Sequence, residues 1–275
     1  MPGGPWDLPA QQLIDSAAGT KLTIVDRNDK FSYACNTCGL CCRDKVIKLS
    51  PYDVIRIART GGISTSQAVA LYTVRRGSLL RFSPVGHCVA LDGTRCQIHS
   101  GRPLACRLYP LGLKRLPLAG PVSCVERFVR LEPTAGSSGV YGSSGTVEEF
   151  LEAHGTARYL AAVALYHPLV AAFGARVAAL VDLEHTEPRE FWRRAAREAL
   201  AETGFDANPL IDALYDPDGL GCGRSSAEET AAGHVVLLAG LAARERDGAR
   251  LAAAAAMLAI GLGYAPDEAC RDSVS

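Results

Sequence analysis

Three features are missing from this sequence of 275 residues, and each absence narrows the class of protein. Its first sixteen residues, MPGGPWDLPAQQLIDS, contain neither a basic region nor an apolar run, so we find no secretory signal. The longest nearly apolar stretch, 251–263, is too short to cross a bilayer. No glycine-rich nucleotide loop follows a predicted strand. We therefore expect a soluble cytoplasmic protein with no membrane partner.

Net charge is also missing, but the zero total hides an asymmetry along the chain. Residues 1–131 contain 18 Lys and Arg against 8 Asp and Glu, whereas residues 132–275 contain 11 against 21. A basic half and an acidic half suggest two units with different tasks. We do not expect nucleic acid as the partner of the basic half, because no platform of aromatic residues accompanies the positive charge.

Cysteine, by contrast, is abundant, with ten residues in the chain. Eight of them fall between positions 35 and 124, and we predict that these are metal ligands: Cys35, Cys38, Cys41, Cys42, Cys88, Cys96, Cys106 and Cys124. Without a secretory signal, metal binding explains such a set better than disulfides do. Cys222 and Cys270 are interpreted as ordinary cysteines.

The stretch FSYACNTCGLCCRDK, residues 31–45, has the densest spacing of thiols. A C-x2-C turn lets two sulfurs reach one metal, and thiolates favour zinc, copper(I) or iron–sulfur clusters. The first three cysteines match the spacing of bacterial ferredoxin-type clusters, but Cys42 follows Cys41 at once. Neighbouring side chains diverge in extended backbone, so this pair indicates either two sites or one ligand with a supporting neighbour.

Several residues beside the cysteines have two interpretations. Arg102 and Arg107 are candidates for contact with cluster sulfurs or a bound anion, and Arg43, Lys45 and Arg95 for compensation of the negative charge; simple surface solvation is the alternative. His87 or His99 could replace one thiolate, although an ordinary hydrogen-bonded histidine is the preferred interpretation. Pro103, Tyr109 and Pro110 are expected to stiffen and cover the loop around Cys106. A catalytic cysteine would need a base partner that the sequence does not place.

The predicted fold is α+β, mainly α: a small metal-stapled domain with a β-hairpin, followed by an all-α unit. The domains we predict are an N-terminal extension at 1–30, a cysteine cluster at 31–131, a Gly/Ser-rich linker at 132–145 and an Ala-rich helical unit at 146–275. The predicted elements are a helix at 7–19, a strand at 21–27, helices at 51–62 and 64–77, a hairpin around Asp92-Gly93 carrying Cys88 and Cys96 on its strands, and helices at 147–180 with a break near His167-Pro168, 188–203, 208–215, 226–246 and 249–262.

The ordered motifs CNTCGLCC, a single Cys88, CQIH, RPLACRLYP and a final Cys124 resemble the YkgJ-type cysteine-cluster family over residues 31–131. That resemblance implies a zinc- or iron-chelating domain with eight cysteines. The sequence departs from the family pattern at His99, where Tyr is frequent, and after Cys124, where Pro-Gly often follows. Flagellin lysine N-methylases carry a similar cluster, which implies a methyltransferase using S-adenosylmethionine as the alternative function.

The interpretation we adopt is a metal-binding protein that holds an iron–sulfur cluster, or else zinc, through up to eight thiolates. The centre would have a structural, redox or regulatory role. The helical unit offers a surface for a protein partner that the sequence does not identify.

Overall fold

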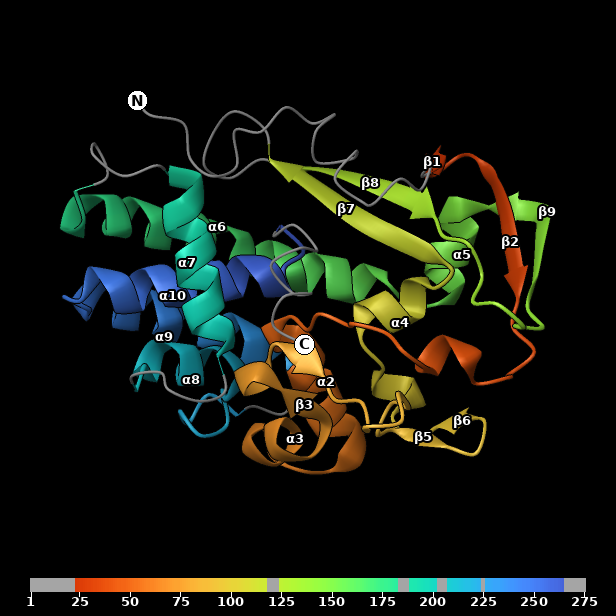
Figure 1. Cartoon of the computed structure of the whole chain (residues 1–275), viewed down its shortest axis with the longest axis horizontal. Coiled ribbons are helices and arrows are strands. Elements are labelled where there is room, and N and C mark those ends of the chain that lie inside the picture. Colours follow the sequence, from red (N-terminus) through yellow and green to blue (C-terminus); the bar gives the residue numbers. More distant parts are fainter. Residues whose placement is uncertain (1–22, 118–123, 183–187, 202–206, 224–225, 265–275) are drawn as a thin grey trace.

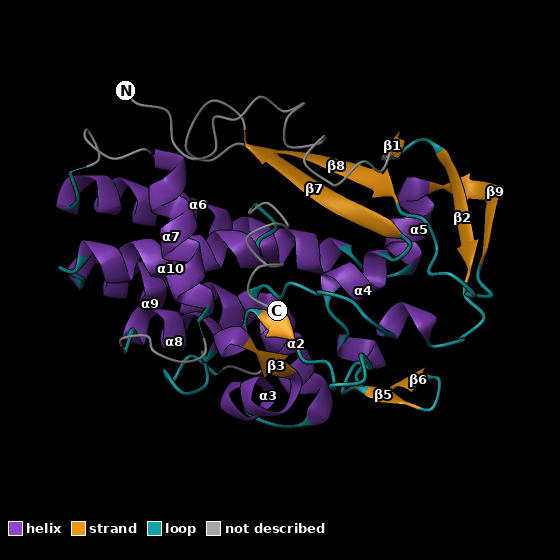
Figure 2. Ribbon diagram, viewed as in Figure 1, coloured by secondary structure: helices purple, strands orange, loops and turns teal. Residues whose placement is uncertain are grey.

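The computed structural model describes residues 23–117, 124–182, 188–201, 207–223 and 226–264. Long helices lie side by side at one end of the molecule, and the strands and cysteine loops lie at the other (Figure 1). Figure 2 separates the two kinds of structure and confirms the predicted α+β class with mainly helical content. The helix predicted at 7–19 falls outside the described residues.

The strands form small antiparallel sheets rather than one large sheet. Their order is β1–β8–β7 in the largest sheet, with β2–β9, β3–β4 and β5–β6 as pairs. The bounds are β1 Thr23–Val25, β2 Lys30–Ala34, β3 Thr73–Val74, β4 Leu79–Leu80, β5 Leu91–Asp92, β6 Arg95–Cys96, β7 Leu111–Pro117, β8 Cys124–Arg130 and β9 Val140–Thr146. The predicted strand at 21–27 is confirmed as β1, whereas the β7–β8 hairpin was not predicted.

The helices follow their capping signals closely. Their bounds are α2 Pro51–Gly61, α3 Thr65–Tyr72, α4 Leu104–Leu108, α5 Val147–Ala153, α6 Ala157–Leu180, α7 Pro188–Leu200, α8 Pro209–Tyr215, α9 Ala227–Arg244 and α10 Gly248–Gly261, with short 3₁₀ turns at Leu40–Cys42, Arg75–Gly77 and His99–Gly101. In α2, Ser50 and Asp53 form a reciprocal capping box, and Gly62 adopts a left-handed conformation at the end. The prediction for this helix is confirmed.

The hairpin at Asp92-Gly93 is present, but it is shorter than predicted. Its first strand, β5, begins at Leu91, so Cys88 lies before the hairpin and not on it. Cys96 is on the second strand, opposite Leu91. Cys88 instead forms an isolated bridge with Phe82. The prediction for Cys88 was wrong because the chain turns after Cys88, where Leu91 N–H donates to the Cys88 carbonyl.

The helical break lies at residues 154–156 rather than at Pro168. Gly155 adopts a left-handed conformation (φ 60°) after α5, whereas α6 continues through Pro168. Proline removes one helical hydrogen bond, but Tyr166 and Leu169 on either side of it are buried in the core. Tertiary packing therefore outweighs the local preference for a break. The Gly/Ser-rich segment at 132–145 also differs from the prediction of a flexible connection, since β9 pairs with β2 there.

The two predicted units share one hydrophobic core. Tyr52 of α2 and Tyr159 of α6 are both fully buried, and their rings meet edge to face with centroids 5.2 Å apart. The Tyr52 hydroxyl also donates to Glu228 of α9 at 2.6 Å. The cysteine loops are thus anchored on the helical unit.

Among the described residues one helix, α6, is long and apolar enough to cross a membrane by length and composition alone, a test that core helices of soluble proteins also pass.

Candidate metal centre

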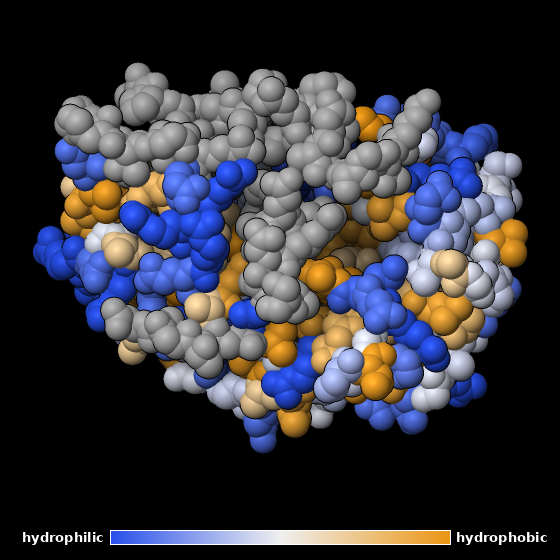
Figure 3. All heavy atoms as spheres, in the orientation of Figure 1, coloured by the Kyte–Doolittle hydropathy of each residue, from blue (hydrophilic) through white to orange (hydrophobic). Residues whose placement is uncertain are grey.

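A single cavity of about 1420 Å³ collects the cysteines of the N-terminal half. Seven of the eight predicted ligands line it: Cys35, Cys38, Cys41, Cys42, Cys88, Cys96 and Cys106. They come from the loop before α2, the segment before β5, strand β6 and helix α4. On the face drawn in Figure 3, hydrophobic residues gather around a hollow between the helical part and the cysteine loops. Folding therefore brings together thiols that are up to 71 positions apart in sequence (from 35 to 106).

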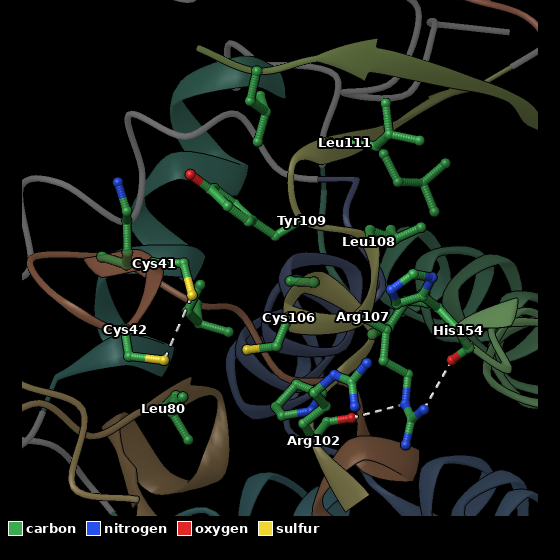
Figure 4. Close-up of a pocket in the computed structure, with 18 of the residues that line it drawn as sticks. Cys41, Cys42, Leu80, Arg102, Cys106, Arg107, Leu108, Tyr109, Leu111 and His154 are labelled. Carbon is green, nitrogen blue, oxygen red and sulfur yellow. Dashed lines mark hydrogen bonds between the residues drawn. The ribbon is translucent and has the colours of Figure 1, made fainter. Parts of the chain in front are cut away.

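The loop from Cys35 to Cys42 turns sharply enough to present its thiols on one side. Thr37 and Gly39 both have positive φ, at 52° and 72°, and a 3₁₀ turn follows at Leu40–Cys42. Cys42 N–H closes this turn by donating to the Gly39 carbonyl at 3.1 Å. The Sγ atoms of the adjacent pair are consequently 3.8 Å apart, and Figure 4 shows them facing the same space. The expected divergence was wrong because it assumed extended backbone.

Cys88 and Cys96 are brought to the cavity by backbone pairing. Cys88 N–H donates to the Cys42 carbonyl at 2.9 Å, which fixes the two cysteines on adjoining segments, and Cys88 is buried. Cys96 occupies β6 and is half-buried. Cys35 is exposed, and Cys38 is half-buried. The cysteines that line the cavity therefore lie at different depths, from its solvent-facing edge to its interior.

Helix α4 carries Cys106, and Asp53 holds this helix in place. The Asp53 carboxylate accepts hydrogen bonds from Leu104 N–H at 2.8 Å and from Ser50 N–H at 2.8 Å. One buried side chain thus caps α2 and α4 at once. Local sequence does not reveal this second role, because the contact with α4 joins residues 51 positions apart.

The thiols shift one another's pKa values, as expected for groups that become negatively charged when they ionise close together. The pKa of Cys41 is lowered to about 7, first by a hydrogen bond from the Cys42 thiol and further by Lys45 and Arg102, against the opposing effect of burial. The pKa of Cys42 rises because its proton is held in that bond and because it is buried. Burial also raises the pKa of Cys106, reinforced by Cys88 and Cys96. A metal cation would displace the retained protons.

Burial raises the pKa of Cys88 and of Cys96 as well. For Cys38 the backbone N–H of Leu40 has the opposite effect and lowers the pKa. Tyr33, beside this loop, has a pKa raised to about 12 by burial and then by Tyr109 and Cys35. Nothing in the sequence marked Tyr33, since its position beside the thiols depends on the pairing of β2 with β9.

The two predicted arginines differ in what they contact. Arg107 is buried, and its guanidinium donates to the carbonyls of Arg102 and His154 (Figure 4). It also donates to the Ser100 carbonyl and lies over the Tyr159 ring. Its donors therefore hold the turn around α4 together. Arg102 is half-buried and donates to the His99 ring and carbonyl, and its charge acts on Cys106 and Cys96. Of the two predicted arginines, Arg102 is thus the one whose charge acts on the cavity thiols.

The histidines and the aromatic residue near the cavity have structural partners. His99 lines the cavity, but its ring nitrogen faces Arg102 at 2.9 Å, and burial followed by Arg102 lowers its pKa. His87 is not among the lining residues. Tyr109 packs edge to face on Tyr33 at 6.0 Å and its hydroxyl accepts from Thr134 N–H at 3.1 Å.

Cys124, the eighth predicted ligand, begins β8 opposite Pro117, at the far end of the hairpin from Leu111 and Arg130. The cavity wall runs along β7 from Leu111 to Arg115, and Arg115 pairs with Glu126, two residues from Cys124. The Cys124 side chain lies outside the described part of the structure, as does Cys270. Cys222 is buried elsewhere and does not line the cavity.

The donor set fits a soft metal, although the thiols do not yet converge. Among the described residues, no group of three or more His, Cys, Asp or Glu side chains is placed to hold a metal ion as the side chains stand. Seven thiols facing one cavity, with Arg102 and Lys45 nearby, nevertheless supply the ligand type and the charge compensation that zinc or iron requires.

Comparison with known proteins gives the same chemistry. Residues 34–125 match the family model CxxCxxCC, whose description reads "Putative zinc- or iron-chelating domain". Neither the curated proteins nor the solved structures contain a match to this chain. The matched segment covers every cysteine that lines the cavity and Cys124 in addition. Residues 34–125 of this chain are therefore similar to the cysteine-cluster domain that the CxxCxxCC model describes.

Proposed function

We propose that the protein holds a resident metal centre in the cysteine-lined cavity, and that this centre is an iron–sulfur cluster in preference to zinc. The observation that carries the proposal is the meeting of seven thiols from four segments in one cavity beside Arg102. The unusual density of thiols, seven at one cavity, supports iron–sulfur chemistry over zinc. An iron–sulfur cluster bound there would supply an electron-accepting group, whereas a bound zinc ion would stabilise the fold.

The residues of this chain would contribute binding and charge balance. Cys41 would be among the first thiols to ionise, since its pKa is about 7, and Lys45 and Arg102 would offset the negative charge of the assembled thiolates. Asp53 and Arg107 would keep α4, and with it Cys106, at the cavity. Because the cavity exists only in the folded chain, metal binding would add directly to the stability of the domain. We therefore assign the centre a structural, redox or regulatory role.

The test is the content of iron, zinc and acid-labile sulfide per chain, measured on protein purified without oxygen. Iron with a matching amount of sulfide supports the cluster. Zinc without sulfide leaves the metal site standing but refutes the preference for iron. Protein that contains neither metal, and takes up neither after reduction, refutes the proposed function.

A second candidate is an enzyme that uses S-adenosylmethionine, and the size of the cavity favours it. Ligand pockets usually occupy about 300–1,000 Å³, and this cavity is larger at about 1420 Å³. Beyond the thiols its wall includes Leu113, Val129 and Val163, so room remains beside a metal centre. Calorimetric titration of the metal-loaded protein with S-adenosylmethionine tests this candidate, and absence of binding heat would remove its support.

Both candidates assign the protein to a reducing compartment. The seven cysteines that line the cavity are free thiols, as metal ligands must be before loading, and we propose the cytoplasm as the location. The helical unit remains our proposed surface for a protein partner.

A further inference from the structure

We propose that Cys41 and Cys42, although adjacent in sequence, bind the same metal ion. This inference rests on the proposed function, because it assigns two of the cavity's thiols to one ion. It also goes beyond that function, since it restricts the kind of metal centre that the cavity accepts.

The first argument is the separation of the two sulfurs. Their Sγ atoms are 3.8 Å apart. Two thiolates that each lie about 2.3 Å from one tetrahedral ion are themselves about 3.8 Å apart, because they span one edge of the tetrahedron. The pair therefore already has the separation of two ligands on a single ion, and loading would require no change in their distance.

The second argument is that the backbone holds this geometry. A 3₁₀ turn places neighbouring side chains about 120° apart around its axis, whereas a strand places them on opposite faces. Two backbone hydrogen bonds fix the turn, from Cys42 N–H to Gly39 and from Arg43 N–H to Leu40. Gly39, with φ 72°, allows the chain to enter it. The turn thus keeps the two side chains closer together than a strand would, within the range where their χ1 rotamers place the sulfurs 3.8 Å apart.

The third argument is that further thiols face the pair. Cys88 is tied to Cys42 by the 2.9 Å hydrogen bond from Cys88 N–H to the Cys42 carbonyl. In Figure 4 the sulfur of Cys106 points toward the side of the cavity where Cys41 and Cys42 stand. These two thiols are the best placed to complete a tetrahedral shell. Cys35 and Cys38, on the preceding loop, are then left for a second site or remain thiols.

The assignment limits the chemistry of the centre. In a four-iron cluster held by four cysteines, each iron takes one cysteine, so two thiolates do not share an ion. An ion bound by both Cys41 and Cys42 is instead a single zinc or iron ion, or one iron of a two-iron, two-sulfide cluster. We infer that the cavity binds a centre of this smaller class.

The first experiment loads the whole chain with ¹¹³Cd, a thiophilic substitute for zinc and iron, and maps coupling between cadmium and the β-protons of labelled cysteines by NMR. We expect the β-protons of Cys41 and Cys42 to couple to one cadmium resonance. Coupling to two different resonances, or coupling of only one of the two residues, overturns the inference while leaving metal binding intact. A chain that binds no cadmium, zinc or iron overturns the proposed function as well.

A second measurement uses the protein reconstituted with ⁵⁷Fe and sulfide. Mössbauer spectra of Cys41→Ser and Cys42→Ser should each change the same iron subspectrum, and Cys222→Ala, outside the cavity, should leave the spectrum unchanged. Four irons with four sulfides per chain in the unmodified protein would overturn the inference, even if neither serine variant folds.

Discussion

Replacing Asp53 by Ala should destabilise the protein by about 3–5 kcal/mol, far more than loss of an ordinary helix cap. Asp53 is 3 % exposed and accepts hydrogen bonds from the backbone N–H groups of Ser50 and Leu104 and from the Ser50 hydroxyl. The alanine variant leaves two buried N–H groups without an acceptor, and each costs about 1–3 kcal/mol. The loss is large relative to a typical total stability of about 5–15 kcal/mol.

The assay is urea denaturation of the variant and of Glu149→Ala, both with and without bound metal. Glu149 occupies the same capping-box position in α5 but is exposed and accepts only from Thr146 N–H in that box, so its loss should cost at most about 1 kcal/mol. Since Asp53 positions the helix that carries Cys106, its variant should also bind metal more weakly, whereas Glu149→Ala should not. Equal destabilisation by the two variants would refute the idea that one carboxylate joins α2 to α4.

Three further changes test other parts of the structure. Gly101→Ala should lower the free energy of unfolding by about 1–3 kcal/mol in urea denaturation, because the new Cβ would lie 2.4 Å from a carbonyl oxygen of α2. The control Gly174→Ala has open space around the new Cβ in α6, so it should be neutral or stabilising. His234 is fully buried and its pKa is lowered to about 4, so the unfolded chain takes up the proton first. This group should therefore contribute a loss of about 3 kcal/mol as pH drops from 6.5 to 4. His234→Gln should remove that part of the pH dependence of the urea midpoint and leave the part due to His167, whose pKa is also lowered to about 4. Arg107→Lys cannot reach all three carbonyls that the guanidinium contacts, and a loss of about 2–4 kcal/mol in the same assay is expected; an unchanged midpoint would contradict the role of Arg107 in holding α4.

The predictions that succeeded from sequence depend on local chemistry. The helix starts predicted at residues 51 and 147 are confirmed as those of α2 and α5, where Ser50 and Thr146 cap the first turn. These signals act over three residues, so no knowledge of the fold is needed. The type of metal ligand was equally local, because thiolate chemistry is a property of cysteine and eight of ten cysteines are concentrated in one third of the chain.

The predictions that failed depend on contacts between distant residues. The β7–β8 hairpin, the pairing of β9 with β2 and the continuity of α6 through Pro168 each rest on packing that local propensity does not report. The break was predicted from a proline, but burial of Tyr166 and Leu169 keeps the helix intact. The separation of Cys41 and Cys42 likewise depended on whether their turn was extended or 3₁₀, which the sequence alone left open.

By itself the sequence determined the kind of atom offered to a metal, the number of such atoms and the places where most helices begin, because these are properties of single residues and of residues within one turn. The tertiary structure alone decided which thiols meet. Seven of them face one cavity because α4 is held by Asp53 and Arg107, while Cys88 is tied to Cys42 through the backbone. It also separated the two arginines: Arg102 donates to His99 while its charge acts on Cys96 and Cys106, and Arg107 donates to three carbonyl groups. Such assignments require distances between side chains far apart in the chain, and only the packed core sets those distances.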